Sequence, residues 1–399
     1  MTAQQTNQAA QGNDSQAGTD RPLFRPLSVR GVTLPNRIVM APMTRSHAPG
    51  GVIGEGVDAY YRRRAEHDIG LIVTEGIGVD HPAAIGIGSM GEDNEPQLHN
   101  DQSKARWKSV VKGVHAAGGI IFPQLWHQGV IRMDNTGPFP DACSVRPSGI
   151  WGPAGRVQSA LPDYIEQSMP ETSPMTDSEI ADVIAAFARS AADARDIGFD
   201  GIAIHGAHGY LVDSFFWHET NRRTDAWGGP TLAERAHFGV ELVKAIRNAV
   251  GDIPIMFRYS QWKLQDYEGR LANNPSELES LLGPLSDAGV DIFDASTRYY
   301  HLPAFEGSAL TLAGWTKKIT GKPTSAVGGI GLSKELKESF TGAVEVNDNI
   351  GDVEARIDAG EFDLASVGRS ILADPAWVEK VRKGEPLNPF SPAALAELY

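Results

Sequence analysis

The sequence predicts a (β/α)8 barrel, an α/β fold in which eight parallel strands alternate with helices. Eight short apolar runs span roughly 360 residues, the extent expected of such a TIM barrel with inserted loops. Each run is nearly continuous in apolar residues, as in strands that helices cover on both faces. The first run is followed by APMTRSHAPGG, which lacks the G-x-G-x-x-G turn of the alternative fold, a doubly wound sheet.

The predicted strands leave room for a helix after most of them. They are RIVMAP (37–42), LIVTEG (71–76), GIIFPQLW (119–126), DGIAIH (200–205), PIMFRYS (254–260), DIFDAS (291–296), PTSAVGG (323–329) and FDLASVG (362–368). The clearest helix is 176–198, because Thr176 or Ser178 can cap its start and Gly198 stops it. A second is predicted over 231–251, where Thr231 and Glu234 form a capping-box pattern.

The remaining segments complete the domain organisation. Residues 1–20 are rich in Gln, Asn, Ala, Gly and Ser and are expected to form a disordered tail, and residues 21–399 are expected to form one barrel domain. Residues 27–37 predict a hairpin lid over the lower end of the barrel. A long insert after the third strand, residues 128–176, is rich in proline and glycine and is expected to form a wall or cover over the site.

Composition excludes several classes of partner. The net charge is −14, which argues against nucleic acid or an anionic membrane surface, although one phosphate can still be held locally. No apolar run reaches about 18 residues, so no membrane span is expected, and the tail does not resemble a signal peptide. The single cysteine, Cys143, cannot form an internal disulfide or an iron–sulfur cluster. We expect a cytoplasmic protein that acts on a small molecule.

The active site of such a barrel lies at the C-terminal ends of its strands. The candidates at these ends are Pro42, Met43, Thr44, Gly76, Gln124, Trp126, His205, Arg258, Gly328, Gly329, Gly368 and Arg369. Glycines after the seventh and eighth strands let backbone amides approach a phosphate, and Arg369 adds a bidentate donor. We therefore interpret these two ends as a phosphate site. The alternative is that the glycines only make turns.

The fourth strand ends in an unusual group of proton-handling side chains, His205, His208 and Tyr210. Two histidines can donate hydrogen bonds to one oxygen, and a tyrosine stays protonated at neutral pH and can deliver a proton. A metal pair is an alternative, but no matching third ligand stands at another strand end. A second alternative is that all three side chains only fill the core.

Six motifs together resemble the old yellow enzyme family, flavin-dependent ene-reductases on a barrel that binds FMN. They are NRIVMAPMTR (36–45), FPQLWHQG (122–129), IHGAHGYLVDSFF (204–216), TNRRTDAWGG (220–229), FRYS (257–260) and VGR (367–369). The resemblance runs from about residue 23 to residue 389, with the motifs in the same order and spacing throughout. It implies that residues 21–399 form an FMN-binding domain.

The resemblance also implies roles for the cofactor site. Gln124 would hydrogen-bond the pyrimidine edge of the flavin, and Arg258 would lie beside N1 and the C2 carbonyl. Thr44 would hydrogen-bond the C4 carbonyl. Backbone contacts to the ring system would come from Pro42, Met43 and Gly76, and phosphate contacts from Gly328, Gly329, Gly368 and Arg369.

For catalysis, the resemblance implies that His205 and His208 bind the carbonyl or nitro oxygen of the substrate and that Tyr210 protonates the α carbon. NADH or NADPH would reduce the flavin in a ping-pong cycle. Many family members carry asparagine in place of His208. Residues 260–270 are atypical, and Trp262 there is expected either to reshape the pocket or to pack outside it. Trp126, Tyr299 and Tyr300 are expected to line the substrate pocket.

Other functions remain open at this point. The same residues could support a flavin-dependent desaturase or oxidase, or a dehydrogenase that oxidises C–N bonds. A protein that holds flavin without turnover, or a barrel that binds a sugar phosphate, is a further alternative. Larger iron–sulfur relatives are not expected, because one cysteine cannot ligate a cluster. The physiological substrate, the preferred nicotinamide and the state of a possible homo-oligomer stay open.

Overall fold

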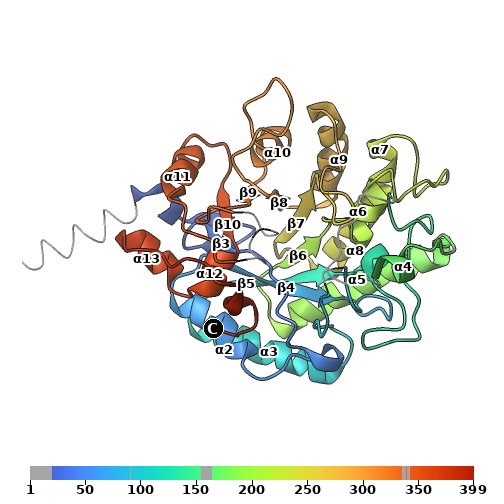
Figure 1. The fold of residues 1–399 in the computed structure, drawn as a ribbon, viewed down its shortest axis with the longest axis horizontal. Coiled ribbons are helices and arrows are strands. Elements are labelled where there is room, and N and C mark those ends of the chain that lie inside the picture. Colours follow the sequence, from blue (N-terminus) through green and yellow to red (C-terminus); the bar gives the residue numbers. More distant parts are fainter. Residues whose placement is uncertain (1–19, 90, 154–163, 335–337, 339–341) are drawn as a thin grey trace, which may run out of the picture.

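The computed structural model describes residues 20–89, 91–153, 164–334, 338 and 342–399 (Figure 1). The first 19 residues of the predicted tail lie outside this range. Within it, a ring of helices surrounds a closed barrel of eight parallel strands, in the order β10-β3-β4-β5-β6-β7-β8-β9. The predicted (β/α)8 fold is therefore confirmed, and the doubly wound alternative is wrong.

Each predicted apolar run coincides with one barrel strand, although β4 extends two residues beyond the predicted run 71–76. The strands are β3 Ile38–Met40, β4 Leu71–Gly78, β5 Ile121–Trp126, β6 Ile202–His205, β7 Ile255–Ser260, β8 Ile292–Ser296, β9 Thr324–Val327 and β10 Leu364–Val367. The parallel register pairs His205 with Arg258 and Ser260 with Ser296. Side chains at these paired positions share one end of the barrel, which brings residues far apart in sequence together.

The helices begin and end where capping chemistry allows. The longer ones are α2 Val57–Glu66, α3 Asp101–Ala116, α5 Asp177–Ile197, α8 His237–Val250, α9 Pro275–Ala288, α10 Leu312–Thr320 and α11 Ile350–Asp358. The shorter ones are α4 Tyr164–Ser168, α6 Leu211–Phe216, α7 Leu232–Arg235, α12 Arg369–Ala373 and α13 Trp377–Lys383. Thr176 caps α5 in a capping box, and Gly198 ends it at a φ of 108°. The single helix predicted over 231–251 is divided at Ala236 into α7 and α8.

A hairpin closes the lower end of the barrel, as predicted. Strands β1 Leu27–Val29 and β2 Val32–Leu34 pair antiparallel. Leu34 of this hairpin belongs to one apolar cluster with residues of the barrel strands, namely Val39, Leu71, Val73, Phe122, Ala203, Met256, Ile292 and Leu364. Each member of this cluster is at most 3% exposed. The lower half of the barrel is thus a packed apolar core, as is usual for this fold.

Short 3-10 helices complete the connections: η1 Pro22–Phe24, η2 Pro49–Gly51, η3 Gly129–Ile131 and η5 Pro392–Leu395. The last of these lies at the upper end of the barrel. Arg45 fastens it by donating hydrogen bonds to the carbonyl oxygens of Leu395 and Glu397, at 3.0 and 2.8 Å. Among the described residues, no helix combines the length and apolar character that a membrane span needs.

Candidate active site

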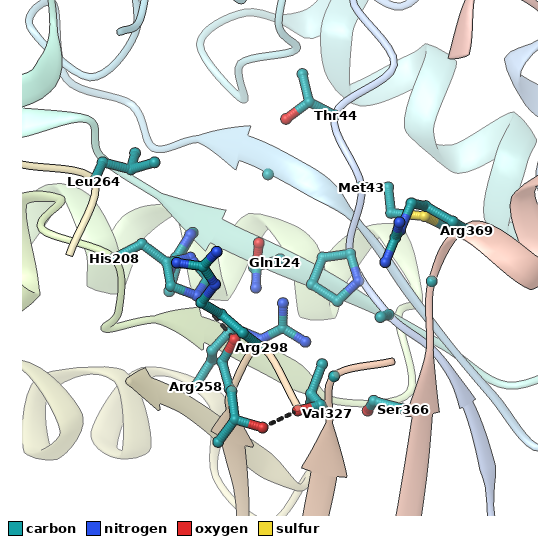
Figure 2. Close-up of a pocket in the computed structure, with 18 of the residues that line it drawn as sticks. Met43, Thr44, Gln124, His208, Arg258, Leu264, Arg298, Val327, Ser366 and Arg369 are labelled. Atoms are coloured by element: carbon teal, nitrogen blue, oxygen red, sulfur yellow. Dashed lines mark hydrogen bonds between the residues drawn. The ribbon is translucent and has the colours of Figure 1, made fainter. Parts of the chain in front are cut away.

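A cavity of about 520 Å³ opens at the C-terminal ends of the strands, and every barrel strand, or the residue after it, contributes to its lining. Figure 2 shows His208 and Leu264 on one side of it and Met43 and Arg369 on the other, with Gln124 between them. All the predicted catalytic and cofactor residues line this cavity, and so does Trp126. The strand-end rule therefore brings residues from the whole length of the chain to one place.

Tyr299 and Tyr300 are different, because neither belongs to the cavity lining. The amide of Tyr300 donates to the carbonyl oxygen of Gly328 and turns the chain outward. Its buried hydroxyl then donates to Asp352 at the start of α11, at 2.7 Å. The ring of Tyr299 lies against His301, with centroids 6.0 Å apart. The structure thus corrects their predicted placement in the substrate pocket.

Two buried side chains at the floor of the cavity have donors that face no protein acceptor. Among the described residues, neither Nε2 of Gln124 nor one terminal nitrogen of Arg258 has a hydrogen-bond partner. Nε of Arg258 donates to Asp294 at 2.6 Å, and both side chains are buried. Leaving a buried donor unsatisfied costs about 1–3 kcal/mol, so such groups point to a ligand that accepts from them. The carbonyl and nitrogen edge of a flavin is such a ligand.

Glycines shape the opposite part of the cavity. Gly328 has a φ of 131°, and a Cβ atom there would lie 2.5 Å from the carbonyl oxygen of Thr297, so only glycine fits. Gly329 and Gly368 also line the cavity, and Arg369 follows at the start of α12. Nη2 of Arg369 donates to the carbonyl oxygen of Lys334 at 2.8 Å. This cradle and the floor donors together fit the FMN that the sequence resemblance implies.

The residues 205–210, hereafter the histidine turn, bring three rings together. The ring centroid of His205 lies 5.1 Å from that of His208 and 5.0 Å from that of Tyr210. Burial, and then Arg258, holds the pKa of His205 well below its usual range. Burial, followed by His205, Arg258 and Lys263, does the same to the pKa of His208. Burial raises the pKa of Tyr210 well above its usual value, so the hydroxyl keeps its proton.

The backbone of the histidine turn adopts a left-handed conformation that its neighbours hold in place. His208 has a φ of 66° and Gly209 a φ of 85°. A Cβ atom on Gly209 would lie 1.9 Å from Oε1 of Gln265, so the turn requires glycine there. The amide of Gly209 donates to Asp213 at 2.6 Å. Asp213 in turn accepts from Nζ of Lys263 at 2.7 Å, and both side chains are fully buried. Sequence reasoning missed this ion pair.

Residues 260–270, hereafter the wall segment, form one side of the cavity. The ring of Trp262 stacks on His208, with centroids 4.3 Å apart, and on Tyr267, with centroids 5.5 Å apart. The guanidinium of Arg298 lies 4.6 Å from the centroid of Tyr267. Trp262, Tyr267 and Arg298 all line the cavity, so Trp262 reshapes the pocket and does not pack outside it. The sequence signal for this wall is the pair of aromatic residues Trp262 and Tyr267, which follow the strand β7 that carries Arg258.

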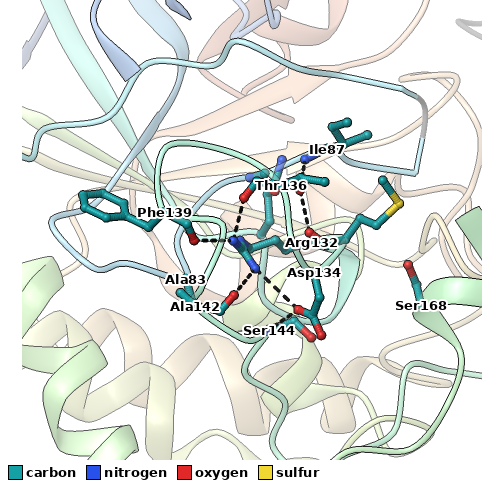
Figure 3. Close-up of polar contacts among 12 residues, drawn as sticks. Ala83, Ile87, Arg132, Asp134, Thr136, Phe139, Ala142, Ser144 and Ser168 are labelled. Carbon is teal, nitrogen blue, oxygen red and sulfur yellow. Dashed lines mark hydrogen bonds and ion pairs between the residues drawn. The ribbon is translucent and has the colours of Figure 1, made fainter. Parts of the chain in front are cut away.

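The insert, residues 128–176, is the segment that the sequence predicts to form a wall or cover over the site. Its described part, 128–153 and 164–176, contributes no residue to the cavity lining. Arg132, which is fully buried, holds the insert by donating to the carbonyl oxygens of Thr136, Phe139 and Ala142, at 2.6 to 3.0 Å (Figure 3). It also donates to the carbonyl oxygen of Ile85 at 3.0 Å. The insert contacts the wall segment through residues that do not line the cavity, because Nε2 of Gln265 donates to the carbonyl oxygen of Trp151 at 3.3 Å.

Known proteins resemble the chain over almost its whole length. Residues 22–388 match the NADH:flavin oxidoreductase / NADH oxidase family. The chain is 31% identical to 12-oxophytodienoate reductase 7 of Oryza sativa subsp. japonica over 380 residues, which cover 94% of this chain and 92% of that protein. It is 30% identical to an NADH oxidase of Thermoanaerobacter brockii, with 91% of this chain and 51% of that protein covered.

Solved structures agree with these sequence matches. Morphinone reductase superimposes with a TM-score of 0.74 at 27% identity, over 94% of this chain and 93% of that one. A structure of morphinone reductase in complex with tetrahydroNAD gives a TM-score of 0.75 at 27% identity, over 94% of both chains. The closed eight-stranded barrel is thus shared along with the sequence. The chain belongs to the old yellow enzyme family of NADH:flavin oxidoreductases.

Proposed function

We propose that the protein is an FMN-dependent ene-reductase, which reduces the activated C=C bond of α,β-unsaturated carbonyl or nitro compounds with NADH or NADPH in a ping-pong cycle. One observation carries the proposal. Two neutral histidines and a protonated tyrosine converge on the cavity whose floor holds the unsatisfied donors of Gln124 and Arg258. The domain that holds both sets of residues is the barrel, residues 21–399.

The cofactor part of the proposal rests on residues that fit FMN. Gln124 and Arg258 would hold the pyrimidine edge, with Arg258 fixed by its ion pair to Asp294. Pro42, Met43, Thr44 and Gly76 would contact the ring system, and the glycine cradle with Arg369 would hold the phosphate. Bound FMN would supply hydride to the β carbon and regain it from the nicotinamide.

The remaining roles belong to the histidine turn. His205 and His208 would donate hydrogen bonds to the carbonyl or nitro oxygen and so withdraw electrons from the conjugated double bond. A neutral imidazole can do this through its single N–H, and the lowered pKa values keep both rings neutral at neutral pH. Tyr210 would deliver its hydroxyl proton to the α carbon. The raised pKa of Tyr210 keeps that proton available.

The direct test is one anaerobic half-reaction. The purified protein, loaded with FMN, is reduced with NADH, freed of excess nicotinamide and mixed with 2-cyclohexenone. Return of the oxidised-flavin absorption band, with 2-cyclohexenone converted to cyclohexanone, is the expected result. If the reduced absorption spectrum persists in the presence of the enone, the proposed ene reduction is wrong.

A second candidate has one observation in its favour, the 30% identity to a protein named NADH oxidase. In this alternative the enzyme returns electrons to oxygen, whether it oxidises NADH, desaturates a ketone or oxidises a C–N bond. The same experiment separates the two functions. The oxidase is favoured if the reduced protein does not react with 2-cyclohexenone but recovers its oxidised-flavin absorption band within the mixing time when oxygen is admitted.

A further inference from the structure

Three contacts fix His208, and two of them are made by residues outside the family motifs, Ser296 and Trp262. Nε2 of the His208 ring lies 2.9 Å from the hydroxyl oxygen of Ser296 at the end of β8. The ring of Trp262 covers one face, at 4.3 Å between centroids and 24° between planes. The backbone amide of His208 donates to the hydroxyl of Ser260 at the end of β7, at 2.9 Å. Together these contacts hold a residue whose φ of 66° is unfavourable for a side chain with a Cβ atom.

The two serines have distinct tasks, although they are paired in the register of β7 and β8. The hydroxyl proton of Ser260 is donated to the carbonyl oxygen of Trp262 at 2.7 Å, so this serine accepts from the amide of His208. Among the described residues, the hydroxyl of Ser296 is hydrogen-bonded only to His208. Its proton is therefore available for the ring nitrogen.

The proton on this ring matters because His208 is neutral and carries only one N–H. If Nε2 held the proton, it would donate to Ser296, and Nδ1 would carry only a lone pair. A lone pair would repel the oxygen of a bound ligand. If Ser296 donates to Nε2, the proton must lie on Nδ1, which then becomes a donor. Of the two arrangements, only the second gives His208 the role in oxygen binding that the proposed function needs.

We infer that Ser296 is a positioning residue: its hydroxyl donates to Nε2 of His208, fixes the tautomer with the proton on Nδ1, and so makes His208 a hydrogen-bond donor to the substrate oxygen. The stack with Trp262 fixes the plane of the ring, and the hydrogen bond to Ser296 sets which ring nitrogen lies toward β8. The inference rests on the proposed function, which requires His208 to donate to the oxygen of the substrate.

The first test observes the tautomer in the wild-type protein and needs no turnover. The FMN-loaded protein is labelled with ¹⁵N-histidine, and two-bond ¹⁵N–¹H correlation spectra are recorded at neutral pH. The signals of His208 are those missing from His208→Asn. A pattern with the proton on Nδ1 is expected. A proton on Nε2, or on both nitrogens, would overturn the inference even if no variant of Ser296 folds.

The second test measures the affinity of the loaded protein for p-chlorophenol, whose oxygen stands in for that of the substrate. Ser296→Ala should weaken binding about tenfold, the size of one hydrogen bond of about 1.4 kcal/mol. Ser296→Thr keeps a hydroxyl and should stay within about twofold of the wild type. Unchanged affinity in Ser296→Ala, or a loss in Ser296→Thr as large as in Ser296→Ala, would contradict the inference.

A matched control removes another buried hydroxyl. Ser190 on α5 accepts from the amide of Asp80 at 2.8 Å and does not line the cavity, so Ser190→Ala should leave p-chlorophenol affinity and the His208 spectrum unchanged. The two proposals also fail separately. Failure of 2-cyclohexenone to oxidise the reduced enzyme would refute ene reduction, whereas the tautomer and the phenol affinity report on Ser296 alone.

Discussion

The insert and the wall segment are both long connections at the upper end of the barrel, yet the wall segment lines the cavity and the described residues of the insert, 128–153 and 164–176, do not. The insert follows β5 and is held by Arg132, whose guanidinium binds mainly backbone carbonyl oxygens within and beside the insert. The wall segment follows β7 and is held by Lys263, whose partner Asp213 also binds the histidine turn. A loop anchored to the histidine turn can shape the cavity, whereas a loop anchored mainly to its own backbone contacts only the outer side of the wall segment.

The largest expected effect comes from removing the hydroxyl of a buried tyrosine in the histidine turn, Tyr210. The matched control is a buried tyrosine in the insert, Tyr164. Tyr210→Phe should slow reoxidation by 2-cyclohexenone by about 10²–10⁴-fold, the usual contribution of a positioned proton donor. Reduction by NADH should stay near the wild-type rate. Tyr164→Phe should leave both half-reactions unchanged. Stopped-flow absorbance measures each step, and an equal loss in both half-reactions of Tyr210→Phe would refute its role as proton donor.

The next effect concerns the anchor of the wall segment. Lys263→Met leaves the Asp213 carboxylate buried without its partner, which should lower the free energy of unfolding by about 3–5 kcal/mol. Adding Asp213→Asn removes the charge, keeps an acceptor for Gly209, and should restore most of the loss. Guanidinium titrations at a fixed, saturating FMN concentration give the values. A loss below about 1 kcal/mol would be typical of an exposed pair and would contradict this anchor.

The corresponding change in the insert should be smaller and should not affect the site. Arg132→Lys keeps the charge but loses the planar fork that serves several carbonyl oxygens, so the free energy of unfolding should fall by about 1–3 kcal/mol. The affinity of the FMN-loaded protein for p-chlorophenol should stay within about twofold of the wild type. A tenfold loss of affinity would show that the insert contributes to the cavity after all.

A matched pair of aromatic residues sharpens the comparison further. Trp262→Ala removes the stack on His208 and should weaken p-chlorophenol binding by about three- to tenfold, in line with an aromatic pair worth about 0.5–1.5 kcal/mol. Phe139→Ala in the insert, where the ring is 37% exposed, should leave binding unchanged. Calorimetric titration compares the two variants. Equal effects would remove the distinction between the two loops.

The smallest expected effect is that of pH. Burial raises the pKa of Tyr210, so the tyrosine remains the protonated form up to at least its ordinary pKa of about 10. Burial lowers the pKa values of both histidines, so these rings remain neutral as the pH rises from the mildly acidic range. The rate of reoxidation by 2-cyclohexenone should therefore change less than about twofold between roughly pH 7 and 9. A steep fall would assign the proton to another group.

The sequence predicted the barrel because burial on both faces leaves a strong signal, a continuous apolar run, at each of eight strands. It also predicted the site residues that stand directly at strand ends, since parallel strands bring those positions together. His205 and Arg258 are neighbours in the register for this reason. Their roles in catalysis and in binding FMN stay predictions.

Several features that sequence reasoning missed involve loop residues, because no periodicity fixes the direction of a side chain there. Tyr299 and Trp262 are both aromatic residues just beyond a strand, but only Trp262 faces the cavity. The pairing of Lys263 with Asp213 spans 50 positions in the chain and requires the folded barrel to bring them together. Ser296 carries no signal of its own, because serine is common at strand ends.

The hairpin at the lower end of the barrel has a consequence for kinetics. The apolar side chains that it covers fill the barrel axis, so molecules cannot pass through from below. Under the proposed function, the nicotinamide and the electron acceptor would then enter and leave by the same opening, at the upper end. Two reactants that share one entrance cannot occupy the cavity at the same time. Each should therefore inhibit the enzyme at high concentration, and this inhibition should be competitive against the other reactant. Entry and release through that opening can then limit the turnover rate.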